Sequence, residues 1–128
     1  MTINSFASVS LDPPLVVWSL SARSRNLAAF RDCECFAVNV LSGSQAALAT
    51  RFAGPGIEER FSASMDAISP EGVPVLRDTL ATIVCTNWQQ LSKGDHLMLL
   101  GIVIRAQRAP GSPLVFHEGR FKALTEHH

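Results

Sequence analysis

The sequence has no tyrosine and little charge: charged residues make up 17% of its 128 positions, and the formal net charge is zero. The absence of tyrosine excludes a tyrosine acid or base from any mechanism. The balanced charge shows neither a basic footprint for nucleic acid nor a polybasic patch for an anionic membrane. Hydrophobic residues make up 47%, which is typical of a globular chain, and the length predicts a single domain over residues 1–128.

Long apolar runs are also missing. None approaches the roughly 20 residues that a membrane-spanning helix needs. The first residues lack the basic and apolar segments of a secretory signal peptide. The three cysteines, Cys33, Cys35 and Cys85, are an odd number, which favours reduced thiols. We therefore expect a cytoplasmic protein that has no contact with a membrane.

The motifs of several enzyme classes are absent. There is no G-x-G-x-x-G or P-loop motif for a nucleotide and no G-x-S-x-G nucleophile elbow. Cys33 and Cys35 lack a second pair of ligands nearby, so buried thiols are favoured over a metal site. We expect no metal and no covalent catalyst.

Strand patterns dominate the chain. The predicted strands are Leu15–Leu20, Phe36–Leu41, Leu80–Leu91, His96–Arg108 and Leu114–Leu124. The predicted helices are Arg25–Arg31, capped by Ser24, a second from Ser42 to Phe52, and a turn at Glu58–Phe61. Gly94 and Asp95 predict a hairpin between the two longest strands. Long antiparallel strands usually close into a barrel, so the predicted fold is mainly β, a barrel with few short helices.

Four polar segments are candidate binding sites: Thr2–Ser8, Ser21–Arg25, Gly94–His96 and Phe116–Arg120. The hydroxyl, amide and backbone groups of the first suit an anionic or amide-rich ligand. Arginines beside Ser24 at a predicted helix start suit a phosphate. Each segment also has a purely structural interpretation, as a turn, a solvated surface or an ordinary strand position.

Taken in order, these segments resemble the short-chain flavin reductases. Members of this family are the reductase components of two-component flavin-dependent monooxygenases, and their fold is the FMN-binding split β-barrel, which is Greek-key-like. The resemblance rests on Thr2–Val16, Ser24 with Leu27, Phe36–Leu41, Ala49–Gly54, Gly94–His96 with Gly101, and His117–Phe121. It covers nearly the whole chain, and the opening segment is the most specific.

The resemblance implies an NAD(P)H:flavin oxidoreductase that passes a hydride from nicotinamide C4 to flavin N5 and supplies reduced FMN or FAD to a partner monooxygenase. It implies that the flavin is held by Thr2, Ile3, Asn4, Ser5, Phe6, Ser8 and Val9, with Arg23, Ser24 and Arg25 near its phosphate. It places NADH or NADPH against His96, Phe116, His117, Glu118 and Gly119, and it implies that no residue acts as an obligatory acid or base. It also implies a homodimer with flavin sites near the subunit interface.

Family members have a further N-terminal segment, usually a helix and one or two strands, before the flavin-holding residues. The resemblance therefore implies that this chain is N-terminally truncated or that its barrel is incomplete, which would leave a strand edge exposed. Two alternatives stay open. One is a non-catalytic flavin-binding or electron-carrier protein on the same barrel, and the other is a folding-deficient relic or interaction subunit.

Overall fold

The computed structural model describes residues 1–53 and 66–124. Its strands are β1 (Ala7–Leu11), β2 (Pro14–Ser21), β3 (Cys35–Val40), β4 (Asp66–Ile68), β5 (Pro74–Leu76), β6 (Ala81–Lys93), β7 (His96–Arg108), β8 (Val115–His117) and β9 (Arg120–Lys122). Its helices are α1 (Leu27–Asp32) and α2 (Ala46–Ala53). Among the described residues, no helix is long and apolar enough to span a bilayer.

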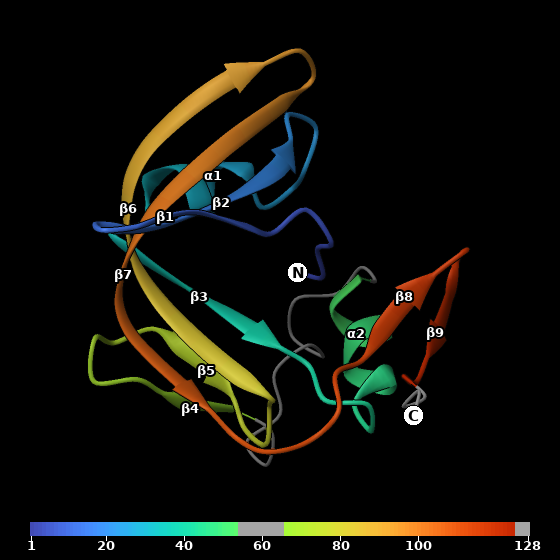
Figure 1. Cartoon of the computed structure of the whole chain (residues 1–128). Coiled ribbons are helices and arrows are strands. Elements are labelled where there is room, and N and C mark those ends of the chain that lie inside the picture. The colour runs from blue at the N-terminus through green and yellow to red at the C-terminus, as the bar shows by residue number, and fades with distance from the viewer. Residues whose placement is uncertain (54–65, 125–128) are drawn as a thin grey trace.

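The main sheet is antiparallel, with the strand order β1-β2-β7-β6-β3. Its long β6–β7 hairpin curves strongly, and β4–β5 and β8–β9 form separate small sheets (Figure 1). The turn between β6 and β7 contains Gly94 at a φ of 58°, a conformation that glycine adopts without steric cost. Within the described chain the sheet does not close, because β1 and β3 each have one strand neighbour. The mainly β, split-barrel prediction is thus confirmed.

The core lies on one face of this curved sheet. Alternate residues of β2 point inward, so Val16, Trp18 and Leu20 are buried. They pack with Phe36 of β3 and with the inward residues of β6 and β7. Trp18 meets the rings of Phe30 and Phe36 edge-on, at centroid distances of 5.0 and 5.8 Å. The contact between Trp18 and Phe30 holds α1 against the sheet.

The predicted helix start at Ser24 is wrong. Helix α1 begins at Leu27, Asn26 occupies the N-cap position, and no side chain caps the helix. The Ser24 hydroxyl instead accepts a hydrogen bond from the Asn26 N–H at 3.1 Å, so it stabilises a local turn before the helix. The capping box predicted at Ser42 and Gln45 forms only in part. Gln45 Oε1 accepts the Ser42 N–H at 2.9 Å, but the Ser42 hydroxyl pairs with that of Ser44, and α2 begins at Ala46.

Two other predicted segments differ from the structure. The predicted last strand, Leu114–Leu124, is a hairpin, because Glu118 and Gly119 turn the chain with φ angles of 52° and 75°. The polar opening segment is only partly a loop, since Ala7–Leu11 forms β1 against β2. Strands β4 and β5 were not predicted, and the turn predicted at Glu58–Phe61 lies outside the described residues.

Candidate functional site

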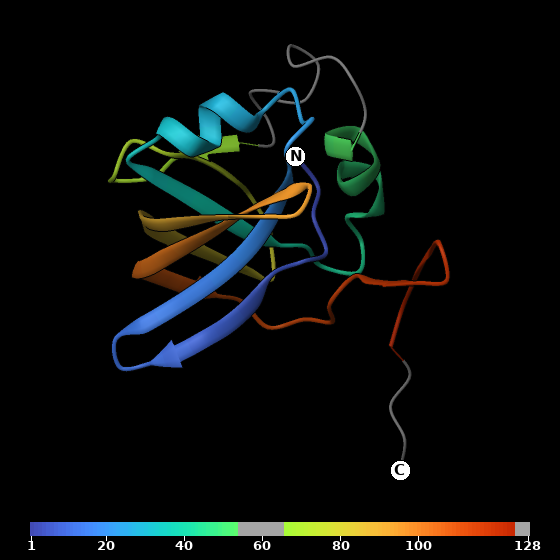
Figure 2. The same cartoon turned by 90° about the horizontal axis from the view of Figure 1, so that it is seen from above.

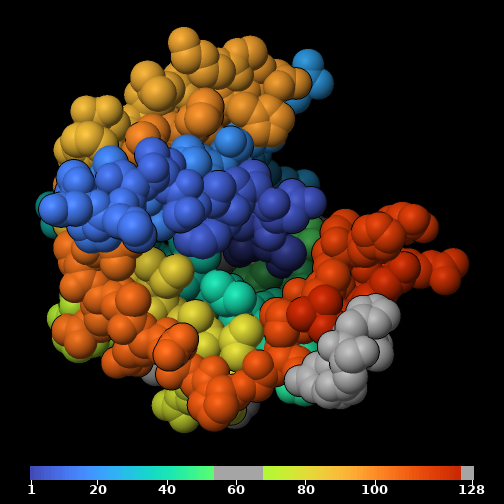
Figure 3. Space-filling view, viewed as in Figure 1, coloured from blue at the N-terminus to red at the C-terminus, as the bar shows by residue number. Residues whose placement is uncertain are grey.

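A cavity of about 820 Å³ opens between the main sheet and α2. Its lining comes from the N-terminal residues, β3, α2 and the β8–β9 hairpin. Figure 3 shows the recess between the dark blue N-terminal residues and the red β8–β9 hairpin. No charged side chain is among its described lining residues. The cavity therefore suits an apolar group, and any charged part of a ligand is expected at its rim.

The N-terminal segment Met1–Phe6 forms one wall of this cavity. It runs between the main sheet and α2, as Figure 2 shows from above. The Thr2 hydroxyl donates to the Ala49 carbonyl at 2.6 Å, and the Ser5 hydroxyl bonds both the backbone N–H and the carbonyl of Ser19. These two hydroxyls hold the segment in place. The exposed Asn4 amide lines the cavity and has no hydrogen bond to a described residue, so it is available to a ligand.

The Ser21–Arg25 loop lies against this same segment. The Ser24 hydroxyl is 3.9 Å from the Met1 sulfur, so the two segments predicted to hold the flavin meet at the cavity rim. The side chains of Arg23 and Arg25 are exposed. Because α1 has only six residues and begins beyond this loop, attraction of an anion here depends on the two guanidinium groups.

His96 lies beside that loop and not in the cavity lining. It begins β7 at the tip of the long hairpin, and the neighbouring Asp95 carbonyl accepts the Ala22 N–H at 2.9 Å. His96 Nδ1 is 2.7 Å from an oxygen of the Asp95 carboxylate. This hydrogen bond lowers the pKa of Asp95. The structure therefore groups His96 with Ser21–Arg25, apart from the other predicted nicotinamide residues.

The Phe116–Gly119 segment divides between two faces of the β8–β9 hairpin. Phe116 lines the cavity together with Phe121, and their ring centroids are 5.2 Å apart. His117 belongs to the opposite face, where its Nδ1 is 3.3 Å from Lys122 Nζ. Glu118 and Gly119 form the turn. Ser8 and Val9, which belong to β1, also lie outside the cavity lining.

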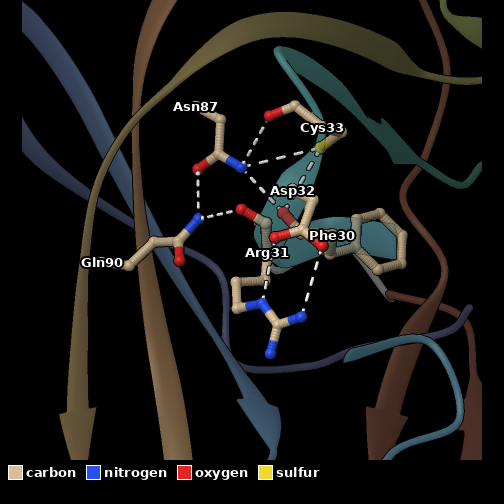
Figure 4. Close-up of polar contacts among 6 residues, drawn as sticks. All are labelled: Phe30, Arg31, Asp32, Cys33, Asn87 and Gln90. Atoms are coloured by element: carbon tan, nitrogen blue, oxygen red, sulfur yellow. Dashed lines mark hydrogen bonds and ion pairs between the residues drawn. The ribbon is translucent and has the colours of Figure 1, made fainter. Parts of the chain in front are cut away.

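A polar network missed by the sequence analysis supports the cavity wall (Figure 4). The Asn87 amide donates to the carbonyls of Phe30, at 2.7 Å, and Cys33, at 3.0 Å. Gln90 donates to the Arg31 carbonyl at 2.7 Å and to Asn87 Oδ1 at 3.2 Å. The two amides thus satisfy carbonyls at the C-terminal end of α1. No sequence signal identifies them, because two amides in a strand do not reveal which helix end they contact.

The thiols of Cys33 and Cys85 and the buried indole of Trp18 do not supply reactive groups to the cavity. Burial raises the pKa of Cys33, and it raises that of Cys85 to about 11, so both favour the thiol form and neither is an activated nucleophile. The Trp18 indole nitrogen is fully covered and has no hydrogen-bond partner among the described residues. Since it is inaccessible, it does not donate to a ligand in the cavity.

The chain is an open β-barrel with an apolar cavity, and comparison with known proteins identifies the family to which it belongs. Residues 1–125 match the model of the flavin reductase like domain, so the chain belongs to this family. The chain is 45% identical over 122 residues to the FMN reductase (NADH) SmoA of Agrobacterium fabrum, covering 94% of this chain and 68% of that protein.

Solved structures agree. The chain resembles BorF, the flavin reductase component of a bacterial two-component tryptophan halogenase, with a TM-score of 0.89 and 31% identity, covering 97% of this chain and 81% of BorF. It also resembles the NADH:FAD oxidoreductase SgcE6 of Streptomyces globisporus in complex with NAD and FAD fragments. That match has a TM-score of 0.89 and 32% identity, and it covers 95% of this chain and 74% of the other.

Proposed function

We propose that this chain catalyses the NAD(P)H-dependent reduction of FMN or FAD. The observation that carries the proposal is the meeting of the Met1–Phe6 segment with the Ser21–Arg25 loop at the rim of an apolar cavity. A flavin has an apolar ring with an amide-like edge and an anionic phosphate. The cavity suits the ring, the Asn4 amide suits its polar edge, and Arg23 and Arg25 suit the phosphate.

The protein's part is to bind and orient two ring systems. Thr2 and Ser5 fix the flavin-holding segment through their bonds to α2 and β2, and Ile3 and Phe6 give it an apolar surface. His96 and the Phe116–Gly119 segment bind the nicotinamide cosubstrate. When bound, the flavin supplies the hydride acceptor, and close stacking of the rings replaces a bimolecular encounter by an oriented one. A side chain acting as a nucleophile is not needed.

The proposal extends to the assembly and the partner. We infer that the chain is cytoplasmic, that two copies form a homodimer with the flavin sites near the interface, and that the reduced flavin passes to a partner monooxygenase. Relatives support the second point, since one is the reductase component of a flavin-dependent trigonelline monooxygenase of Acinetobacter baylyi. Exposed apolar side chains, such as Leu11 and Trp88, supply surface for the first.

Mixing the purified chain with FMN or FAD and following NADH and NADPH absorbance tests the activity. We expect rapid oxidation that depends on added flavin. The N4A and R23A/R25A variants should raise the KM for flavin. The control R108A removes an exposed arginine at the end of β7 and should leave this KM unchanged. Tightly held flavin with negligible turnover would instead indicate a non-catalytic carrier, and no flavin-dependent oxidation at all would refute the proposal.

A further inference from the structure

Among the described residues, the cavity lining includes two side-chain amides, those of Asn4 and Asn39. Asn4 belongs to the N-terminal segment and is already part of the proposed flavin site. Asn39 belongs to β3 and lies directly opposite Thr82 of β6. The other cavity-lining residues of β3 and β5 carry no side-chain nitrogen or oxygen. The Asn39 amide is therefore an isolated polar group on an apolar wall.

Two donors fix the orientation of the Asn39 amide. Its Oδ1 accepts the backbone N–H of Leu76 at 3.2 Å and the hydroxyl of Thr82 at 3.2 Å. Because a backbone N–H only donates, the atom that it meets must be the amide oxygen. The Thr79 hydroxyl lies 3.0 Å from that of Thr82 and can donate to it, which leaves the Thr82 proton for Asn39. Both fixed contacts thus belong to the oxygen of the amide.

The amide nitrogen of Asn39 is left without a hydrogen bond to a described residue. Within the described chain, the one fully covered side-chain nitrogen or oxygen that lacks a partner is the indole nitrogen of Trp18. The Asn39 nitrogen is therefore accessible, and since Asn39 lines the cavity, a ligand there can reach it. Asn39 offers the cavity two N–H donors and no free acceptor.

Such a group selects a hydrogen-bond acceptor on the ligand. The flavin ring has two carbonyl oxygens on one edge, and reduction of the ring places negative charge on that edge. No charged side chain is among the described lining residues, so neutral donors must meet this charge. A hydrogen bond to a charged acceptor is roughly twice as strong as one to a neutral acceptor. A donor fixed in advance therefore favours the reduced ring over the oxidised ring.

We propose that the Asn39 amide donates to a carbonyl oxygen of the flavin ring and thereby favours the reduced, anionic form of the flavin. The contacts with Leu76 and Thr82 hold the amide in the donating orientation. This inference rests on the proposed function. The carboxamide oxygen of nicotinamide is an acceptor of the same kind, so the experiment must separate the two ligands.

The N39D variant removes the donor and keeps the acceptor. One oxygen of the new carboxylate still accepts the Leu76 N–H and the Thr82 hydroxyl, while the other has no proton to donate at neutral pH. Lumiflavin, which has the ring without the ribityl chain and phosphate, reports on the ring alone. By fluorescence quenching, we expect lumiflavin and FMN to bind about tenfold more weakly to N39D than to the wild type. Isothermal titration should give an unchanged affinity for NAD⁺.

The reduction potential of bound FMN distinguishes this role from a structural one. It compares the affinities for reduced and oxidised flavin, so we expect it to become more negative in N39D, where a carboxylate repels the reduced ring. A merely loosened cavity would weaken both forms alike and leave the potential unchanged. N39A also lacks the donor and should shift the potential in the same direction, so it serves if N39D unfolds.

Two further measurements serve as controls. Q89E makes the same change of amide to carboxylate at an exposed position of β6 outside the cavity lining, and it should alter neither affinity nor potential. Acid protonates the new carboxyl of N39D and restores a donor. The lumiflavin affinity of N39D should therefore rise toward that of the wild type as the pH falls, whereas that of N39A should not.

Three results would overturn the inference. The first is unchanged lumiflavin binding in N39D, and the second is weaker binding with an unchanged potential. The third is weaker NAD⁺ binding with unchanged lumiflavin binding, which would assign the amide to nicotinamide instead. Each leaves the proposed function intact if the wild type oxidises NADH in the presence of flavin, whereas a wild type without that activity refutes the function itself.

Discussion

At the scale of single residues, Asn87 connects the sheet to the cavity. Its amide donates hydrogen bonds to the backbone carbonyls of Phe30 and Cys33 at the end of α1. Both of these residues line the cavity. Removing the amide leaves polar groups unsatisfied in a partly buried place. A buried carbonyl without a hydrogen-bond partner lowers the free energy of unfolding more than the loss of a solvent-exposed hydrogen bond does.

We therefore expect N87A to lower the free energy of unfolding by about 1–3 kcal/mol. The matched control is Q89A on the same strand, where the side chain is exposed and the expected change is within about 0.5 kcal/mol. Urea unfolding followed by tryptophan fluorescence measures both. Equal effects of the two variants would show that the network has no special role.

Gly101 is required by close packing. A Cβ atom there would lie 2.6 Å from Phe36 Cζ and 2.8 Å from Cys85 Cβ. We expect G101A to cost about 1–3 kcal/mol of stability through overpacking. In G43A the new Cβ would meet its nearest neighbour at 3.6 Å, so that control should unfold almost as the wild type does. Thermal unfolding compares them, and adding F36L to G101A should recover part of the loss.

At the scale of elements, an ion pair fastens the β4–β5 hairpin to the sheet. Arg105 Nε of β7 is 3.2 and 2.9 Å from the two carboxylate oxygens of Glu71, which lies between β4 and β5. The hydrogen bond from Arg105 lowers the pKa of Glu71. The native state therefore favours the ionised carboxylate, and the stabilisation requires that Glu71 be charged.

The stabilisation should be complete above the ordinary glutamate pKa of 4.5 and disappear as the pH falls through the lower native value. The wild type should melt at a higher temperature than E71Q at neutral pH, and the difference should shrink in acid. Thermal melts of both proteins over a pH series measure it. A difference that stays constant into acid would show that the carboxylate charge is not responsible.

The elements that the sequence predicts well are those set by local chemistry. The β6–β7 hairpin follows from two long strand patterns and a glycine turn, and β7 has the bounds His96–Arg108 that the pattern predicts. Strand β1 was missed because its hydroxyl side chains suit a loop, while its pairing with β2 is a non-local contact. The split of the last predicted strand depends on positive φ at Glu118, which residue type alone rarely reveals.

The candidate site shows the same division between features that local sequence predicts and features that depend on non-local contacts. Polar segments stand out by composition, and the structure brings Thr2, Ile3, Asn4, Phe6 and Phe116 to one cavity. Ser24 does not line that cavity but lies 3.9 Å from Met1, which does. Composition does not tell which face of a hairpin a residue occupies, so the separation of Phe116 from His117 required the strand register. The resemblance groups His96 with His117, whereas the structure places His96 beside the Ser21–Arg25 loop, because the neighbouring Asp95 carbonyl accepts the Ala22 N–H.

At the scale of the whole molecule, the cavity and its basic rim should separate the parts of a flavin. Riboflavin has the ring and no phosphate, so we expect FMN to bind more tightly than riboflavin at low salt. Added salt and the R23A/R25A change should each weaken FMN binding and leave riboflavin binding nearly unaltered. The difference between the affinities of FMN and riboflavin should therefore become smaller. Quenching of flavin fluorescence measures the affinities of FMN and riboflavin for the wild type and for R23A/R25A. An equal loss of affinity for both ligands in R23A/R25A would argue that the two arginines do not bind the phosphate.

The open edges of the main sheet have a practical consequence. Within residues 1–53 and 66–124, β1 and β3 each have one edge without a partner strand, and such an edge presents free backbone donors and acceptors to other chains. Strand β1 adds the exposed apolar side chains Val9 and Leu11. With a formal net charge of zero, electrostatic repulsion between molecules is weak. Concentrated solutions of the protein should therefore aggregate by pairing of strand edges. We expect V9K, which places a charge on this edge strand, to reduce that aggregation.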